Sequence, residues 1–265
     1  MAGRCLAGRL GATVLTLGAV PAALAPAADG ATSYVALGDS FAAGVGTRSY
    51  YADSGGCYRS PAAYPVLDAG RVGAALSFQA CSGARTGDVV GKQLGTLSAA
   101  TTYVTVQVGG NDAGFSSVIT TCAEPSWASN CGAAIDNAQS YIKNTLPAKL
   151  DNVYAAVRAK APNAKVVVVG YPHLFNGEDC NAGTWFSPTE ERRLNATADL
   201  LNSTTSGRAT AKGFGFVNPV QAFTGHAICD TAEWVNGLSS PTRESYHPNV
   251  RGQTGYANLV DDRLT

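Results

Sequence analysis

The amino-acid sequence predicts an α/β fold, a three-layer αβα sandwich built around a parallel sheet of five strands. Short apolar runs alternate along the chain with longer stretches of helical periodicity. Strands that are apolar throughout are typical of a parallel sheet covered by helices on both faces. The chain has 265 residues and is 45% hydrophobic, which suffices for one large domain with its own core.

Five runs are candidates for the strands. Residues 103–108 and 165–169 are dense in β-branched side chains, which favour strands over helices. The other three candidates are shorter: residues 34–37, 76–80 and 214–217.

Three longer segments are predicted to be helices. Apolar residues recur every three or four positions in 136–160, which indicates one helix with a kink at Pro147. A second helix is expected from Ser187 to about Lys212, because Ser-Pro-Thr-Glu at its start has capping-box spacing with proline at the first helical position. Residues 252–264 are predicted to form the final helix.

The first 28 residues are predicted to be a secretory signal peptide. Arg4 and Arg9 give a positive start, and an uncharged run over 10–20 is too short to span a bilayer. Alanine-rich sequence with several Ala-x-Ala cleavage choices follows. We therefore expect a secreted, extracellular protein with a single domain over 29–265 and no stable membrane anchor.

An even number of cysteines would remain after export. Cys5 lies in the predicted signal peptide, so six of the seven cysteines stay with the domain. An even count in a secreted chain indicates three disulfides, and a zinc site, the alternative, finds no C-x-x-C or His-x-His spacing. Six cysteines allow 15 pairings; the short loop 122–131 is the simplest pair, and sequential pairing would add the other two. The six are Cys57, Cys81, Cys122, Cys131, Cys180 and Cys229.

The charge balance argues against a nucleic-acid partner. Nineteen basic residues match nineteen acidic ones, so the chain has no basic field to hold phosphate backbones. We expect a small-molecule substrate and a monomer.

Polar or small residues follow three of the predicted strands. Ser40, Gly83 and Asn111 each lie three residues beyond a strand candidate. The carboxyl ends of parallel strands meet at one edge of a sheet, where ligands bind in such folds. These residues would bring a hydroxyl nucleophile, a backbone N–H without a Cβ in the way, and a side-chain amide to that edge.

A histidine far along the chain is the candidate general base for the serine. His247 precedes the last predicted helix, and a neutral imidazole can take the proton of a serine hydroxyl near pH 7. Attack on an ester would build an oxyanion, for which the Ser40 N–H, the Gly83 N–H and the Asn111 amide are the predicted donors. His173 and His226 are alternatives that fit surface or packing roles, although His226 could line the site.

The order of these residues resembles the GDSL, or SGNH, family of serine hydrolases. The motif Gly38-Asp-Ser-Phe41 comes first, followed by Gly83, then Gly110-Asn-Asp112, and finally His247. The resemblance implies an SGNH-hydrolase, flavodoxin-like form of the αβα sandwich. It also implies a carboxylic ester hydrolase acting through an acyl-enzyme, without a metal or organic cofactor. The wider context is similar to the secreted, three-disulfide bacterial lipases, esterases and phospholipases A of this family: residues 80–88 and 109–115.

One position departs from the pattern of the family. Its usual acid stands three residues before the histidine as aspartate, and here that position holds Glu244. Some secreted relatives use instead a main-chain carbonyl two residues before the histidine, which here belongs to Ser245. Both alternatives stay open at this point.

The substrate class follows from the aromatic residues. Many of them fall in the predicted loops, where an apolar trough at the sheet edge would suit an acyl chain. We expect a lipase or esterase, with phospholipase A activity possible. The alternatives are an acetyl-carbohydrate (acetylxylan-type) esterase and a non-catalytic lipid- or glycan-binding member of the fold. A cofactor-binding electron carrier of the flavodoxin kind is a further alternative. The sequence argues against it, because no Gly-x-Gly-x-x-Gly turn follows the first strand.

Overall fold

A computed structural model describes residues 1–3 and 32–265 of the chain. Residues 4–28 of the predicted signal peptide lie outside the described residues. Residues Ala31–Thr265 form one compact unit. Within the described part of the chain, no helix is both long enough and apolar enough to cross a bilayer.

The centre of the unit is a five-stranded parallel sheet in the order β2-β1-β3-β4-β5. Its three middle strands are almost fully buried because helices cover both of their faces. The prediction of a parallel αβα sandwich is therefore confirmed. The strands are β1 (Ser33–Gly38), β2 (Ala75–Phe78), β3 (Tyr103–Gln107), β4 (Lys165–Val169) and β5 (Gly215–Val217).

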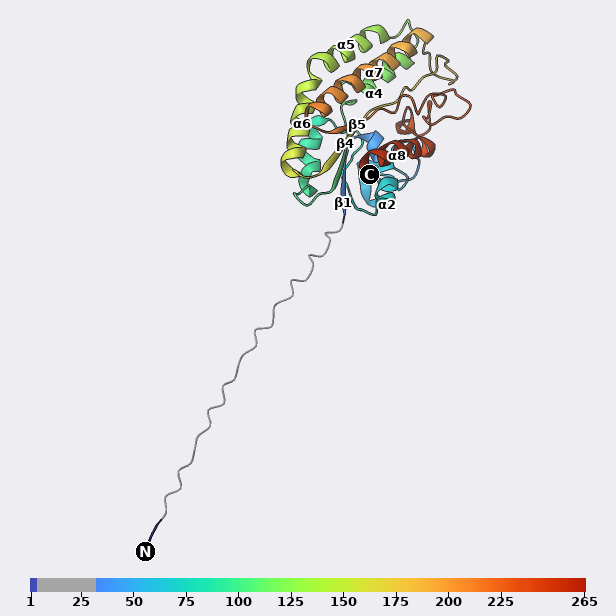
Figure 1. Cartoon of the computed structure of the whole chain (residues 1–265). Coiled ribbons are helices and arrows are strands. Elements are labelled where there is room, and N and C mark those ends of the chain that lie inside the picture. The colour runs from blue at the N-terminus through green and yellow to red at the C-terminus, as the bar shows by residue number, and fades with distance from the viewer. Residues whose placement is uncertain (4–31) are drawn as a thin grey trace. The chain divides into compact units, whose positions relative to one another are not determined.

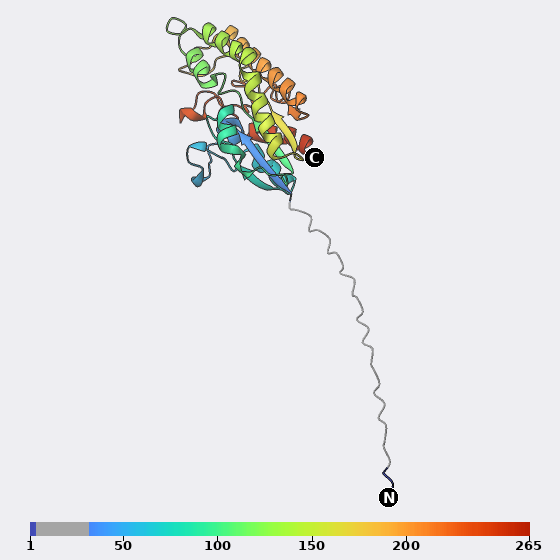
Figure 2. The ribbon, with the colours of Figure 1, turned by 90° about the vertical axis from the view of Figure 1, so that its left-hand side faces the viewer.

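Two layers of helices enclose this sheet (Figure 1). One layer holds α4 (Phe115–Ala123), α5 (Cys131–Asn144), α6 (Leu146–Lys160) and α7 (Pro188–Ala211). Figure 2 looks at this layer, with α5 and α6 in yellow-green and α7 in orange running along one another. The other layer holds α2 (Tyr64–Arg71) and α8 (Val250–Leu264).

The remaining helical pieces are single turns or little more. They are α1 (Ser40–Ala43), α3 (Thr86–Asp88), the π-helical segment Val89–Gln93, and the 3-10 segments Ala52–Cys57, Leu94–Thr96 and Thr242–Glu244.

The single kinked helix predicted over 136–160 is wrong, because the structure forms two helices there. The first, α5, begins earlier, at Cys131, where the Asn130 side chain accepts a hydrogen bond from the Ala133 N–H at 3.0 Å. The break lies at Thr145, and Pro147 falls in the first turn of α6. A proline is tolerated at that place because the backbone N–H groups of a first helical turn have no partner within the helix.

The other two predicted helices are present. The start of α7 has the expected capping box: Ser187 Oγ accepts from the Glu190 N–H at 3.3 Å, and Glu190 Oε2 accepts from the Ser187 N–H at 2.9 Å. The last helix, α8, begins two residues earlier than predicted, since Asn249 caps its N-terminus.

The six cysteines of this unit form three disulfides in the sequential order: Cys57–Cys81, Cys122–Cys131 and Cys180–Cys229. All six thiols are thereby paired, which excludes the zinc alternative for these residues. The first bridge joins the 3-10 segment Ala52–Cys57 to the segment after β2, and the second joins the end of α4 to the start of α5. The third joins the loop between β4 and α7 to the loop that follows β5.

Candidate active site

The carboxyl edge of the sheet carries a cleft of about 490 Å³. Ser40, Gly83, Asn111 and His247, which lie far apart in the sequence, all line it. The first three come from the segments that follow β1, β2 and β3, as the strand positions predicted.

Ser40 is placed by a tight turn between β1 and α1. Asp39 caps α1 by accepting a hydrogen bond from the Phe41 N–H at 3.0 Å, so Ser40 is the first residue of the helix. The turn needs glycine at position 38, where φ is 147° and a Cβ would lie 2.4 Å from the Gln107 carbonyl oxygen. Gln93 anchors this glycine by bonding both its N–H and its carbonyl, at 2.8 and 2.9 Å.

The imidazole of His247 lies against the Ser40 hydroxyl. Its Nε2 is 2.8 Å from Ser40 Oγ, and its Nδ1 is 2.7 Å from the Ser245 carbonyl oxygen. A carbonyl only accepts, so Nδ1 carries the proton in the neutral ring and Nε2 accepts from the serine hydroxyl. This tautomer is the one that can remove the proton from Ser40.

The Glu244 carboxylate bonds a tyrosine and makes no hydrogen bond to the histidine. It is 1% exposed, and its Oε1 accepts a hydrogen bond from the Tyr50 hydroxyl at 2.5 Å. The group in contact with His247 Nδ1 is thus the Ser245 carbonyl. Of the two alternatives left open by the sequence, the geometry favours the main-chain one.

Partial burial in the cleft favours the neutral form of His247. Removal from water lowers the pKa of this imidazole from 6.5 to about 4, although the Ser245 carbonyl and the Glu244 charge both act to raise the pKa. The ring is therefore neutral at pH 7, as a general base requires.

Three candidate hydrogen-bond donors belong to residues that line the cleft: the Ser40 N–H, the Gly83 N–H and the Asn111 side-chain amide. The Asn111 side chain donates one N–H to the Ala84 carbonyl at 3.0 Å, which orients the amide and leaves its second N–H free to face the cleft. Gly83 has φ 78°, a conformation that suits glycine. The Ser40 and Gly83 N–H groups take part in none of the backbone hydrogen bonds of the described turns and loops.

Two carboxylates brace these segments. Asp112 accepts from the N–H and the hydroxyl of Thr86 at 2.9 and 2.6 Å, which ties the loop after β3 to α3. Asp39 accepts from the Tyr171 hydroxyl at 2.6 Å, and burial raises the pKa of Asp39 to about 7. Sequence reasoning missed Tyr171, and no local signal marks it, since its partner lies 132 residues away.

The other two histidines do not line the cleft. His173 Nε2 is 2.8 Å from Asp199, and His226 bonds the Ala232 carbonyl and stacks on Trp234 at 4.0 Å between ring centroids. His226 has a packing role, and the alternative that it lines the site is not supported.

The family model and the similar proteins agree with one another. Residues 36–254 match the GDSL-like lipase/acylhydrolase family. The chain is 46% identical to a lipase of Streptomyces rimosus over 87% of this chain and 86% of that protein. It is 45% identical to Lipase 1 of Streptomyces coelicolor over 94% of each.

Solved structures agree with the sequence relatives. Phospholipase A1 of Streptomyces albidoflavus NA297 superposes with a TM-score of 0.83 at 45% identity, covering 88% of this chain and 99% of that one. An extracellular lipase of Streptomyces rimosus gives 0.82 at 44% identity, covering 88% and 100%. An acetylxylan esterase of Geobacillus stearothermophilus, Axe2, gives 0.55 at 14% identity over 88% of this chain and 94% of that one, which shows the shared fold alone.

Proposed function

This chain belongs to the GDSL-like lipase/acylhydrolase family and is an ester hydrolase, and from that premise we propose that it cleaves lipid esters outside the cell through an acyl-enzyme on Ser40. The observation that carries the proposal is the 2.8 Å contact between Ser40 Oγ and His247 Nε2 inside a cleft that also holds the Asn111 amide.

In the first half of the reaction, Ser40 Oγ attacks the ester carbonyl carbon while its proton moves to His247 Nε2. The Ser245 carbonyl keeps its bond to the Nδ1 proton and stabilises the imidazolium that forms. The bond from the carbonyl carbon to the alcohol oxygen then breaks, and His247 gives its proton to that oxygen. The alcohol leaves, and the acyl group stays on Ser40.

In the second half, water takes the place of the alcohol. His247 removes a proton from the water, whose oxygen attacks the acyl carbon, and the bond to Ser40 Oγ breaks as the proton returns to the serine. A free acid is released.

The oxyanion of both halves would be held by the Ser40 N–H, the Gly83 N–H and the Asn111 amide. Fixed donors of this kind contribute roughly 2.7–4 kcal/mol each to lowering the barrier. All three come from segments anchored on the sheet, so the donors need little reorganisation during the reaction.

The surface of the cleft supports a lipid ester as substrate. Trp185 and Leu238 line the cleft and are 55% and 41% exposed, so its rim presents apolar groups to the surroundings. Apolar groups of this size suit an acyl chain better than a sugar hydroxyl. The relatives at about 45% identity are named lipases and a phospholipase A1.

Export is part of the proposal. The first 28 residues have the charge pattern and the alanine-rich end of a signal peptide, and one of the similar structures is described as an extracellular lipase. We assign residues 29–265 to the single domain that remains after cleavage.

The test is covalent labelling with a fluorophosphonate followed by hydrolysis assays. We expect the wild type to be labelled, Ser40→Ala to lose all labelling, and Ser117→Ala, which changes an exposed serine of α4 outside the cleft, to keep it. The p-nitrophenyl esters from C2 to C16, phosphatidylcholine and acetylated xylan then rank the substrates. Folded wild-type protein that resists labelling would disprove the serine mechanism, and preference for acetylated xylan would disprove the lipid assignment.

A further inference from the structure

A single positive charge lines the cleft that holds Ser40 and His247. Among the described residues of this lining, Arg243 is the only arginine or lysine, and Glu124, directly after α4, is the only acidic residue. The His247 ring is neutral at pH 7, because its pKa is lowered to about 4. Arg243 is therefore the one group of the lining that could balance a negative charge on a bound molecule.

The position of Arg243 in the chain brings it close to the reacting groups. It lies in the 3-10 segment Thr242–Glu244, which is followed directly by Ser245, whose carbonyl bonds His247. Residues of this segment and the catalytic histidine line one cleft of about 490 Å³. Clefts of this size take up most of a small ligand, so a molecule whose ester lies at Ser40 can also reach the guanidinium.

Two tyrosines hold the guanidinium in place. Arg243 Cζ lies over the face of the Tyr58 ring, 4.8 Å from its centroid, in a cation–π contact. Tyr58 packs edge-on against Tyr50 with 5.5 Å between the ring centroids, and it directly follows Cys57, which is bridged to Cys81. The orientation of the arginine is thus set before a ligand binds.

The N–H groups of Arg243 are left available by these contacts. Stacking uses the face of a guanidinium, whereas its N–H groups point outward in the plane. The Nε atom lies 3.9 Å from Glu244 Oε1, which is too far for a hydrogen bond, and that oxygen already accepts from the Tyr50 hydroxyl. Within the described part of the chain, Arg243 donates no hydrogen bond, and its side chain is 46% exposed.

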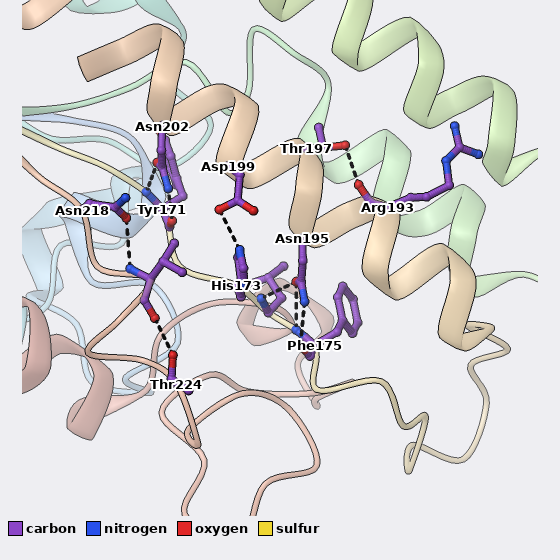
Figure 3. A network of polar contacts seen from close by, with 12 residues as sticks. Tyr171, His173, Phe175, Arg193, Asn195, Thr197, Asp199, Asn202, Asn218 and Thr224 are labelled. Atoms are coloured by element: carbon purple, nitrogen blue, oxygen red, sulfur yellow. Dashed lines mark hydrogen bonds and ion pairs between the residues drawn. The ribbon is translucent and has the colours of Figure 1, made fainter. Parts of the chain in front are cut away.

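Other basic side chains already have partners. Figure 3 shows His173 bonded to Asp199 of α7, and Arg193 of the same helix bonds Asp136 at 2.6 Å. Neither His173 nor Arg193 lines the cleft. An arginine that lines a cleft with free donors differs from these paired ones, because planar N–H pairs of this kind suit carboxylate and phosphate oxygens.

We propose that Arg243 binds the phosphate of the substrate's headgroup and thereby selects glycerophospholipids over neutral glycerides with the same acyl chains. This inference rests on the proposed function, because it concerns the alcohol part of the same lipid ester. A guanidinium can donate two parallel hydrogen bonds to two phosphate oxygens. Only the glycerol carbons separate the phosphate of a glycerophospholipid from its ester oxygens, so one cleft can hold both groups.

The contact acts on the selection of the substrate. The phosphate lies several bonds from the ester carbonyl, so its bonds to Arg243 are the same in the bound ester and in the transition state. Interactions of this uniform kind lower KM and leave the rate of the chemical step unchanged. Esters without a phosphate gain nothing from the arginine.

The experiment compares two substrates that share their acyl chains. Dihexanoylphosphatidylcholine and dihexanoylglycerol are used at concentrations at which both are monomeric, so that they differ in the headgroup alone. We expect the kcat/KM ratio of the phospholipid to the diacylglycerol to fall about tenfold or more in Arg243→Gln, mainly through KM of the phospholipid. A wild-type ratio in Arg243→Gln would overturn the proposal.

Two further variants complete the comparison. Arg192→Gln makes the same change at an exposed arginine of α7 that bonds Thr189 outside the cleft, and should keep the wild-type ratio. Arg243→Lys keeps the charge without the planar pair of donors, so its ratio should lie between those of the wild type and Arg243→Gln. Thermal unfolding reports whether each variant is folded, and Arg243→Lys carries the test if Arg243→Gln is not. An arginine that merely braced Tyr58 would affect both substrates equally and leave the ratio unchanged.

Inorganic phosphate distinguishes a headgroup from a free anion. It is added to the wild type and to Arg243→Gln during hydrolysis of each substrate. Inhibition that disappears in Arg243→Gln, together with an unchanged substrate ratio, would assign the arginine to a free anion and overturn the proposal. A lowered ratio supports the headgroup contact whether or not free phosphate competes.

Fluorophosphonate labelling keeps the two proposals apart. Failure of the folded wild type to be labelled would remove the serine mechanism itself. Normal labelling with a wild-type substrate ratio in Arg243→Gln would remove only the headgroup contact.

Discussion

Ser40 and His247 meet in one hydrogen bond, but two very different kinds of structure hold them. The serine follows the end of β1, one of the buried strands of the sheet. The histidine lies at the end of the loop 218–249, whose only regular element is the short 3-10 segment Thr242–Glu244. Comparison of the two shows how an irregular segment reaches the positional accuracy of a strand end.

On the serine side, the sheet supplies the accuracy. The Asp39 N–H donates to the Gln107 carbonyl at 3.0 Å, which continues the β1–β3 pairing into the turn. Gly38 and Gln93 complete the anchor. Displacement of Ser40 would therefore break contacts that also hold the core.

On the histidine side, one asparagine joins several segments. The Asn236 N–H donates to the His247 carbonyl and its own carbonyl accepts from the Tyr246 N–H, both at 2.9 Å. Its side-chain amide donates to the Gly46 carbonyl at 2.8 Å and to the Glu244 carbonyl at 3.2 Å. The loop is thus positioned by tertiary hydrogen bonds, and it could be displaced without unfolding of the sheet.

The largest expected effect comes from Gly38→Ala on the serine side. The new Cβ would lie 2.4 Å from Gln107 O and 2.9 Å from Ala42 Cβ, in a backbone conformation unfavourable to alanine. We expect the free energy of unfolding to fall by about 3 kcal/mol or more, with activity lost as a consequence. Chemical denaturation measures it, with Gly91→Ala, which has nothing within 4 Å of its Cβ, as the matched control. A stable, active Gly38→Ala would refute the view that the sheet fixes Ser40.

Asn236→Ala should separate activity from stability on the histidine side. Loss of its amide removes two hydrogen bonds that position the loop, so kcat should fall about 10- to 100-fold. The free energy of unfolding should fall by less than about 2 kcal/mol, because the sheet is untouched. Steady-state kinetics and denaturation are compared with Asn258→Ala, whose side chain makes an exposed contact to Arg71. Equal kinetics in the two variants would show that Asn236 does not position His247.

The smallest effect should come from Glu244→Gln, since the carboxylate does not touch the histidine ring. We expect a loss of kcat below tenfold, equivalent to about 1.4 kcal/mol. A loss as severe as that of His247→Ala would instead identify Glu244 as the group that orients the base.

The fall of activity at acid pH tests the histidine side of the site. Burial lowers the pKa of His247 to about 4, and the protonated ring cannot accept the Ser40 proton. The kcat/KM for p-nitrophenyl acetate should therefore fall only as pH drops through about 4, well below the ordinary histidine pKa of 6.5. The Glu244 charge raises the pKa of His247, so Glu244→Gln should move this limb to still lower pH. An acid limb near 6.5 in the wild type would contradict the burial of the ring.

The amino-acid sequence by itself determined the parallel sheet, the capped start of α7 and the arrival of Ser40, Gly83 and Asn111 at one edge. Strand periodicity and capping are local signals, and parallel strands necessarily present their carboxyl ends on the same side. The even number of cysteines also indicated three disulfides, but it left 15 pairings open, and the structure selected the sequential one.

Only the tertiary structure decided the rest. It divided 136–160 into two helices, formed α2 and α4, which no sequence pattern had indicated, and turned Glu244 toward Tyr50, 194 residues away in the sequence. The Ser245 carbonyl contacts His247 Nδ1, an alternative that the family resemblance had offered but that the sequence could not separate from Glu244. The direction of a buried side chain and the space left between packed helices depend on partners distant in the sequence, and so they arise only when the whole core has packed.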